Sequence, residues 1–271
     1  MKICLKYFSG TGNSYKILDT CKKFFINKGC EVELSSVTDE PDIHEEAGLI
    51  GFCFPVYAFG IPRICRQYLS GLPKFSEPVK AFVLITAGDP QEAGFSVRES
   101  NGILKAKGLD VAYSDVIHMP SNWIVAMNPP PKQEARLIIS RGVKKAEQAA
   151  RDILNGASHH HVFNYPPGYS KFGFYKDYYL FKAGVGHLWR NFRTDETCDA
   201  CGLCEKICPT GSIRTVNERP EWKKTCEQCM RCANFCPKKA IFQKGEGSVK
   251  ERNKYYEPTF KPLKLKKHED R

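Results

Sequence analysis

The chain has 271 residues, of which 42% are hydrophobic, enough for one or two packed domains. Its formal net charge of +11 would by itself suit a protein that binds nucleic acid or an acidic protein partner. The longest stretch without a charged residue or histidine, residues 47–62, contains prolines and is shorter than the ~20 residues of a membrane-spanning helix. No apolar signal segment follows Met1, so we expect a cytoplasmic protein with no transmembrane segment and no disulfide framework.

Residues 1–155 alternate strand-like and helix-like patterns. The strand-like segments are residues 2–8, 31–37, 48–54, 79–86 and 109–119. The helix-like segments are residues 14–27, 63–70, 94–107 and 133–154. This alternation predicts an α/β domain with a doubly wound, five-stranded parallel sheet that helices cover on both faces.

The remaining chain divides into three segments of different composition. Residues 156–194 are rich in aromatic side chains, which predicts a connector that packs between domains; contact with a partner or a membrane surface is the alternative. Within it, the run His159–His161 is expected to be solvated rather than to bind metal. Residues 195–244 hold eight of the thirteen cysteines, and residues 245–271 are expected to form a basic, solvated C-terminal extension.

Two similar cysteine motifs lie in residues 195–244. They are Cys198-x2-Cys201-x2-Cys204-x3-Cys208-Pro209 and Cys226-x2-Cys229-x2-Cys232-x3-Cys236-Pro237. This is the pattern of bacterial two-cluster ferredoxins, in which the fourth cysteine of each motif binds the other cluster. Structural zinc is disfavoured because zinc ligands usually come as two separated pairs.

The motifs therefore predict a small α+β ferredoxin domain with two [4Fe–4S] clusters. One cluster would be bound by Cys198, Cys201, Cys204 and Cys236, and the other by Cys226, Cys229, Cys232 and Cys208.

A small, hydroxyl-rich loop follows the first strand and leads into the first helix. Its residues are Ser9, Gly10, Thr11, Gly12, Asn13 and Ser14. Backbone N–H groups at a helix N-terminus attract an anion, and the hydroxyl groups can donate to it. A Walker A loop is excluded because no Gly-Lys-Ser/Thr is present, and a Rossmann fingerprint because Tyr15 stands where a third glycine is needed. The loop suits a terminal phosphate monoester, with a structural turn as the alternative.

Two further loops are expected at the same edge of the sheet, beyond the carboxyl ends of the third and fourth strands. The first contains Pro55, Val56, Tyr57, Ala58, Phe59 and Gly60, and the second contains Thr86, Ala87, Gly88 and Asp89. Their glycine and aromatic content would let backbone and rings approach a planar heterocycle. An ordinary packed turn remains the alternative for each.

These three loops resemble those of flavodoxins. The order of flavodoxin-like domain, aromatic connector and two-cluster ferredoxin is similar to that of the family called EFR1 ferrodoxins, and the similarity extends to about residue 244. The resemblance implies FMN, with its phosphate at residues 9–14 and its ring at residues 55–60 and 86–89. The stretch Pro120-Ser121-Asn122-Trp123 also resembles the family, without an assigned role. The loop around Asp89 lacks the aromatic that many flavodoxins stack on the ring, so we expect the connector or the ferredoxin segment to cover one flavin face.

Together these features predict a flavo-iron–sulfur protein that transfers electrons between FMN and the clusters. Two clusters at roughly −2 each and an FMN phosphate at roughly −2 would leave a net charge of roughly +5, so nucleic acid is not expected as a partner. A redox partner protein, possibly acidic, is expected to dock on the remaining basic surface. A flavin-dependent reductase of a small, quinone-like acceptor and a pure electron carrier are the alternatives.

Overall fold

The computed structural model describes residues 1–39, 43, 47–57, 59–165 and 168–262. The chain forms two compact units. The first comprises Met1–Ser9, Asn13–Ser121 and Lys132–Phe181, and the second comprises Gly10–Gly12, Asn122–Pro131 and Lys182–Arg271. Ala58, expected in a ring-binding loop, lies outside the described residues.

The first unit is built on a parallel sheet with the strand order β2-β1-β3-β4-β5-β6. The strands are β1 (Lys2–Tyr7), β2 (Glu31–Ser36), β3 (Leu49–Pro55), β4 (Val79–Ala87), β5 (Leu109–His118) and β6 (His159–His160). Strand β1 pairs with β2 on one side and with β3 on the other, so that Tyr7 lies opposite both Ser36 and Cys53. The strand order therefore reverses between β1 and β3, which is the switch point at which open α/β sheets bind ligands.

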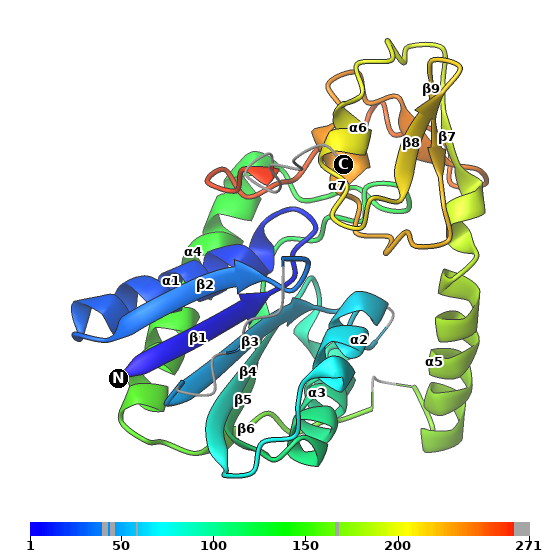
Figure 1. The fold of residues 1–271 in the computed structure, drawn as a ribbon. Helices are drawn as coiled ribbons and strands as arrows, with labels where there is room; N and C mark the ends of the chain where they lie inside the picture. Colours follow the sequence, from blue (N-terminus) through cyan, green and yellow to red (C-terminus); the bar gives the residue numbers. More distant parts are fainter. Residues whose placement is uncertain (40–42, 44–46, 58, 166–167, 263–271) are drawn as a thin grey trace. The chain divides into compact units, whose positions relative to one another are not determined.

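Helices cover the sheet on both faces, as the alternating sequence predicts (Figure 1). They are α1 (Asn13–Asn27), α2 (Arg63–Gly71), the 3₁₀ turn η1 (Pro90–Glu92), α3 (Gly94–Ala106) and α4 (Lys132–Leu154). Helix α1 packs against α4 and helix α2 against α3. Because both faces are covered, β3 is apolar along its whole length, and Phe52, Phe54 and Phe82 are completely buried. The flavodoxin-like α/β fold is thus confirmed.

The sheet has one strand more than the five expected. Strand β6 pairs in parallel with β5, with His159 opposite Tyr113 and His160 opposite Ser114. The backbone N–H of His161 also donates to the carbonyl oxygen of Ser114 at 2.8 Å. Two residues are too few to show the period-2 pattern of a strand, and the exposed side chains of His159 and His160 kept the segment polar. The sequence therefore gave no sign of this edge strand.

The aromatic connector contains helix α5 (Lys171–Val185), which crosses the division between the units. Its residues in the first unit include Phe174 and Tyr178, which are 1% and 3% exposed. Phe174 packs edge-on against Phe59 and Phe95, with ring centroids 5.6 Å apart in both pairs. This part of the connector therefore belongs to the core of the first unit.

The second unit contains a short β-α-β segment that occurs twice. Its elements are η2 (Leu188–Asn191), β7 (Phe192–Thr194), α6 (Leu203–Lys206), β8 (Ile213–Val216), β9 (Arg219–Trp222), α7 (Arg231–Phe235) and β10 (Ile241–Gln243). Strand β7 pairs antiparallel with β10, and β8 pairs antiparallel with β9. This is the small α+β domain expected from the cysteine motifs. Among the described residues, no helix is both long and apolar enough to cross a membrane.

Candidate cofactor-binding sites

The two cysteine motifs have the same backbone conformation at matching positions. Three pairs of residues with positive φ occupy equivalent places in the two halves: Ala200 and Gln228, Gly202 and Met230, and Gly211 and Lys239. Positive φ is uncommon outside glycine, and four of these six residues carry a side chain. The unfavourable positive φ at these residues therefore lets each loop turn around its cysteines in the same way.

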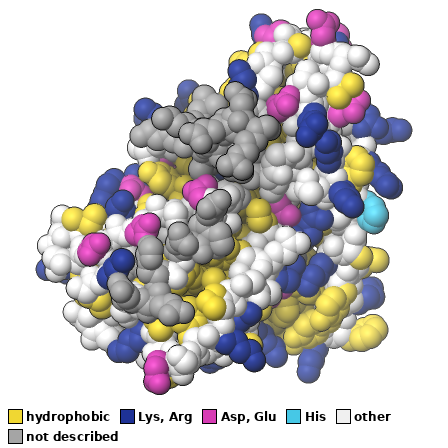
Figure 2. All heavy atoms as spheres, viewed as in Figure 1, with side chains coloured by type: hydrophobic (Ala, Val, Ile, Leu, Met, Phe, Trp, Pro, Cys, Tyr) yellow, Lys and Arg dark blue, Asp and Glu magenta, His cyan; other side chains and the backbone are white. Residues whose placement is uncertain are grey.

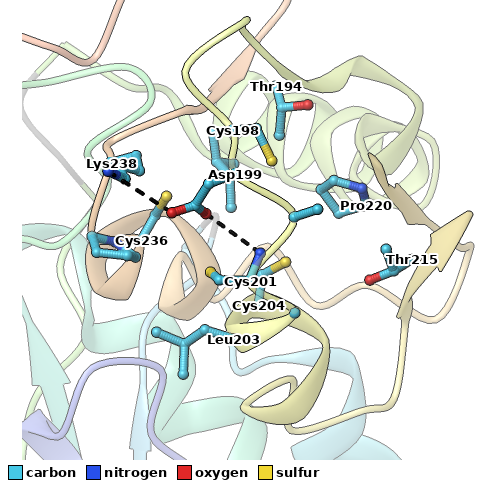
Figure 3. Close-up of a pocket in the computed structure, with 14 residues that line it drawn as sticks. Thr194, Cys198, Asp199, Cys201, Leu203, Cys204, Thr215, Pro220, Cys236 and Lys238 are labelled. Carbon is cyan, nitrogen blue, oxygen red and sulfur yellow. Dashed lines mark hydrogen bonds and ion pairs between the residues drawn. The ribbon is translucent and has the colours of Figure 1, made fainter. Parts of the chain in front are cut away.

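Four cysteines line one cavity in the second unit. They are Cys198, Cys201 and Cys204 of the first motif and Cys236 of the second (Figure 3). Burial raises the pKa of the Cys204 thiol to about 11, and the three other thiols also favour its protonated form. Four thiols that line one cavity suit a positively charged group, which would stabilise them as thiolates.

The other four cysteines form a second set with the same composition, three from one motif and one from the other. Cys226, Cys229 and Cys232 are each at most 9% exposed. Burial raises the pKa of Cys226 to about 12 and that of Cys229 to about 11, and Cys208 contributes to both shifts. Cys208 is therefore near enough to these thiols to favour their protonated form, although it belongs to the first motif.

Backbone N–H groups point at the sulfur of the last cysteine in each motif. The N–H of Ser212 donates to Sγ of Cys208 at 3.2 Å, and the N–H of Ala240 donates to Sγ of Cys236 at 3.4 Å. The two donors occupy the same position relative to their cysteines. Such N–H groups stabilise negative charge on a sulfur and so help to set the potential of a cluster that it ligates.

The surroundings of the two thiol sets differ, although the cysteine spacing of the two motifs is the same. Cys201 of the first set is exposed, whereas Cys226, Cys229 and Cys232 of the second are buried. The positive charge of Arg231, which is 2% exposed, opposes the rise in the pKa of Cys229 that burial causes. Its guanidinium also donates to the carbonyl oxygens of Gly10 and Ile207, both at 2.9 Å. A basic residue inside the second motif, where the first motif has Leu203, was the signal available in the sequence.

The expected phosphate loop lies at the start of α1, after the end of β1. In the first unit, the hydroxyl groups of Ser14 and Thr86 are 2.8 Å apart, and the side-chain amide of Asn13 donates to the carbonyl oxygen of Pro120 at 2.9 Å. Helix α1 has no acidic residue in its first turn. The buried hydroxyls and the helix N-terminus fit an anion.

Residues Gly10–Gly12 of the same loop are grouped with the second unit. There the side-chain amide of Asn122 donates to Oγ1 of Thr11 at 3.0 Å, and the N–H of Glu257 donates to the carbonyl oxygen of Thr11 at 2.8 Å. Gly12 has φ +108°, and a Cβ there would lie 2.6 Å from Cβ of Phe260. Only glycine fits this position. The contacts of Asn13 and Thr11 give the stretch 120–123 a structural role that sequence reasoning left open.

The loop after β3 is tied to β4 and forms a tight turn. The N–H of Val56 donates to the carbonyl oxygen of Thr86 at 3.0 Å, and the N–H of Tyr57 donates to that of Gly60 at 2.8 Å. Phe59 has a positive φ of 65°. The third loop starts at Gly88, and Asp89 accepts a hydrogen bond from its own turn, from the N–H of Gln91 at 2.9 Å. The described residues of the three expected loops thus follow β1, β3 and β4 at one edge of the sheet.

A carboxylate that sequence reasoning missed holds the loop after β3. Glu99, on α3, accepts hydrogen bonds from the N–H of Ile61 at 3.0 Å and from the hydroxyl of Tyr178 at 3.0 Å. Nε of Arg66 lies 2.6 Å from the same carboxylate. Burial and the charge of Glu99 raise the pKa of Tyr178 far above its usual range, so this hydroxyl remains a donor. We call Glu99, Arg66 and Tyr178 the Glu99 clamp.

One known family matches part of the second unit. Residues 187–241 match the family described as the 4Fe-4S dicluster domain. This match and the flavodoxin-like fold of the first unit point to electron transfer. The search of curated proteins found no match.

Solved structures similar to the chain include two flavodoxins and a protein described as a putative quinone reductase. Oxidised flavodoxin 1 from Bacillus cereus is 17% identical with a TM-score of 0.43, over 58% of this chain and 100% of that one. Two-electron reduced Megasphaera elsdenii flavodoxin is 16% identical with a TM-score of 0.41, over 55% and 97%. A putative quinone reductase from Klebsiella pneumoniae is 11% identical with a TM-score of 0.40, over 64% and 93%.

Proposed function

We propose that this protein transfers electrons within one chain between an FMN and two [4Fe–4S] clusters. The observation that carries the proposal is the composition of the two thiol sets, each of which takes three cysteines from one motif and the fourth from the other. This exchange of the fourth ligand is the arrangement of two-cluster ferredoxins. The dicluster match over residues 187–241 supports it.

The proposed ligands are those expected from the motifs. Cys198, Cys201, Cys204 and Cys236 bind one cluster, and Cys226, Cys229, Cys232 and Cys208 bind the other. The N–H groups of Ser212 and Ala240 then face ligand sulfurs and offset their charge. The cavity of the first set is lined by a cysteine-rich loop and by Lys238, which pairs with Asp199 at 3.9 Å.

The proposed FMN site is the switch-point edge of the first unit. The phosphate would lie at Ser9, Gly10, Thr11, Gly12, Asn13 and Ser14, where the N-terminus of α1 and the loop hydroxyls favour an anion. The ring would lie along Pro55–Gly60 and Thr86–Asp89. The Glu99 clamp and the contact of Phe59 with Phe174 hold the first of these ring loops in place. They support the expectation that the connector covers part of the flavin site.

When bound, FMN exchanges one or two electrons and each cluster exchanges one. The chain's own residues bind these groups, exclude water and set their electrostatic surroundings. Among the described residues we identify no nucleophile or general base with a role in this transfer. The full domain order supports membership of the EFR1 ferrodoxin family, which we propose on that basis.

A pure carrier that docks on an acidic partner enzyme is the second candidate. The chain has a formal net charge of +11, and Lys and Arg side chains are spread over the face shown in Figure 2. Steep loss of partner turnover with rising salt would favour this role.

The test is to purify the protein anaerobically and measure its iron and FMN. About eight irons and one FMN per chain support the proposal, whereas stoichiometric zinc with almost no iron contradicts it. NADH or NADPH is then added while the flavin and cluster absorbance is followed. Bleaching within seconds indicates a nicotinamide-dependent reductase; reduction only by dithionite or a reduced ferredoxin indicates a protein-fed carrier.

A further inference from the structure

Arg231 joins the phosphate loop to the second thiol set, and all the residues of this link belong to the second unit. The residue stands inside the second cysteine motif and is 2% exposed. Its Nε donates to the carbonyl oxygen of Gly10 at 2.9 Å, and its Nη1 donates at 2.9 Å to that of Ile207, the residue before Cys208. Burying a charged side chain is costly unless it is hydrogen-bonded, so these contacts fix where the guanidinium lies.

Asn122 makes a second link between the same two parts of the unit. Its side-chain amide donates to Oγ1 of Thr11 at 3.0 Å and lies 3.5 Å from the carbonyl oxygen of Cys229. The backbone carbonyl oxygen of Asn122 accepts a hydrogen bond at 2.8 Å from the side chain of Asn234, a completely buried residue of α7. The second motif therefore holds Asn122 in place, and Asn122 holds the hydroxyl of Thr11.

The guanidinium also brings a positive charge to a loop that has none of its own. Residues 9–14 contain no lysine or arginine, so by themselves they offer an anion only N–H and hydroxyl dipoles. The Arg231 guanidinium lies 5.3 Å from the ring centroid of Phe260, the side chain that a Cβ on Gly12 would meet. The charge is thus fixed beside the loop by the Gly10 carbonyl and by this ring.

The first cysteine motif has different side chains at the equivalent positions. Leu203 stands where the second motif has Arg231, and Lys206 where it has Asn234. Leucine has no donor in its side chain, and Lys206 is exposed. The two motifs share their cysteine spacing, but the side chains that reach the phosphate loop belong to the second motif.

We propose that Arg231 and Asn122 are positioning residues through which the second cysteine motif shapes the loop for the FMN phosphate. The inference rests on the proposed function, because it requires FMN with its phosphate at residues 9–14. Donors to the Gly10 carbonyl and the Thr11 hydroxyl keep the loop in one conformation, and the guanidinium favours the phosphate dianion. The second motif, which is expected to bind a cluster, thereby also determines that the flavin is a phosphorylated one.

The experiment compares FMN with riboflavin, which has the same ring and no phosphate. Full-length, anaerobically purified protein that keeps its clusters is freed of flavin and titrated with each flavin by fluorescence. Wild-type protein should bind FMN more tightly, and Arg231→Met should lower the ratio of riboflavin Kd to FMN Kd roughly tenfold. A change that only destabilises the protein would raise both Kd values together. The matched control is Arg219→Met, which removes an exposed donor to the carbonyl oxygen of Asp195 and should leave the ratio unchanged.

Two further variants keep the test decisive if Arg231→Met loses iron. Asn122→Ala lies outside both cysteine motifs and should lower the same ratio several-fold. Arg231→Lys keeps a charged donor and should retain most of the wild-type ratio. Equal affinity of the wild type for the two flavins overturns the inference alone, as does an unchanged ratio in both Arg231→Met and Asn122→Ala. Wild-type protein that lacks eight irons or binds neither flavin overturns the proposed function instead.

Discussion

The Glu99 clamp gives a quantitative test of how the connector supports the proposed flavin loop. The substitution Glu99→Gln keeps the shape of the side chain but removes the charge that pairs with Arg66 at 2.6 Å. Breaking a fully buried ion pair costs about 3–5 kcal/mol, and the side chains of Glu99 and Arg66 are 11% and 22% exposed. We therefore expect a loss of about 2–3 kcal/mol in the free energy of unfolding, or roughly 5–10 °C in Tm.

The same substitution should weaken FMN binding because Glu99 also accepts the N–H of Ile61 in the loop after β3. We expect roughly a tenfold rise in Kd, equivalent to about 1.4 kcal/mol of lost loop order. Calorimetric unfolding and fluorescence titration of the apoprotein with FMN measure the two effects.

The matched control is Asp19→Asn, an acid-to-amide change in α1. Asp19 pairs with Lys23 at 2.7 Å, but the lysine side chain is 69% exposed. An exposed pair of this kind contributes less than about 1 kcal/mol, so Tm and the FMN Kd should stay close to the wild-type values. If Glu99→Gln behaves like Asp19→Asn in both assays, the assigned role of the clamp is refuted.

Three further predictions concern other parts of the chain. Gly12→Ala should weaken FMN binding and lower Tm in the same assays, because φ of Gly12 is +108° and a Cβ there would lie 2.6 Å from a neighbouring side chain. An unchanged Kd would show that the loop does not need glycine. Cys208→Ser should lower the iron content from about eight to about four and remove the paramagnetic signal that Cys232→Ser also removes. If it instead removes the signal that depends on Cys204, Cys208 does not bind the cluster of the other motif. Burial is the main cause that lowers the pKa of His161, so the unfolded chain binds its proton more readily and stability should fall as the pH drops below about 6.5. His161→Gln should reduce this pH dependence of the free energy of unfolding in urea. An unchanged dependence would show that another group causes it.

Much of the fold followed from local patterns. The alternation of apolar strands with helices predicted the parallel sheet, and the structure has β1, β2, β3, β4 and β5 within one residue of the expected bounds. The exception is β6, whose two residues pair with an edge strand through the backbone and carry exposed histidines. Backbone pairing of this kind depends on proximity, which a short polar segment does not reveal.

The sequence predicted those parts of the candidate sites that lie in short, contiguous motifs. The spacing of the cysteines and the loop Ser9–Ser14 are contiguous in the chain, so the sequence alone determined which residue types could hold clusters or a phosphate. The partners of these motifs come from distant positions. Glu99 contacts Ile61 and Tyr178, and Arg231 donates to the carbonyl oxygens of Gly10 and Ile207. Only the tertiary structure decided these contacts, because each depends on which side chains folding buries together and no local pattern of charge or hydrophobicity records that.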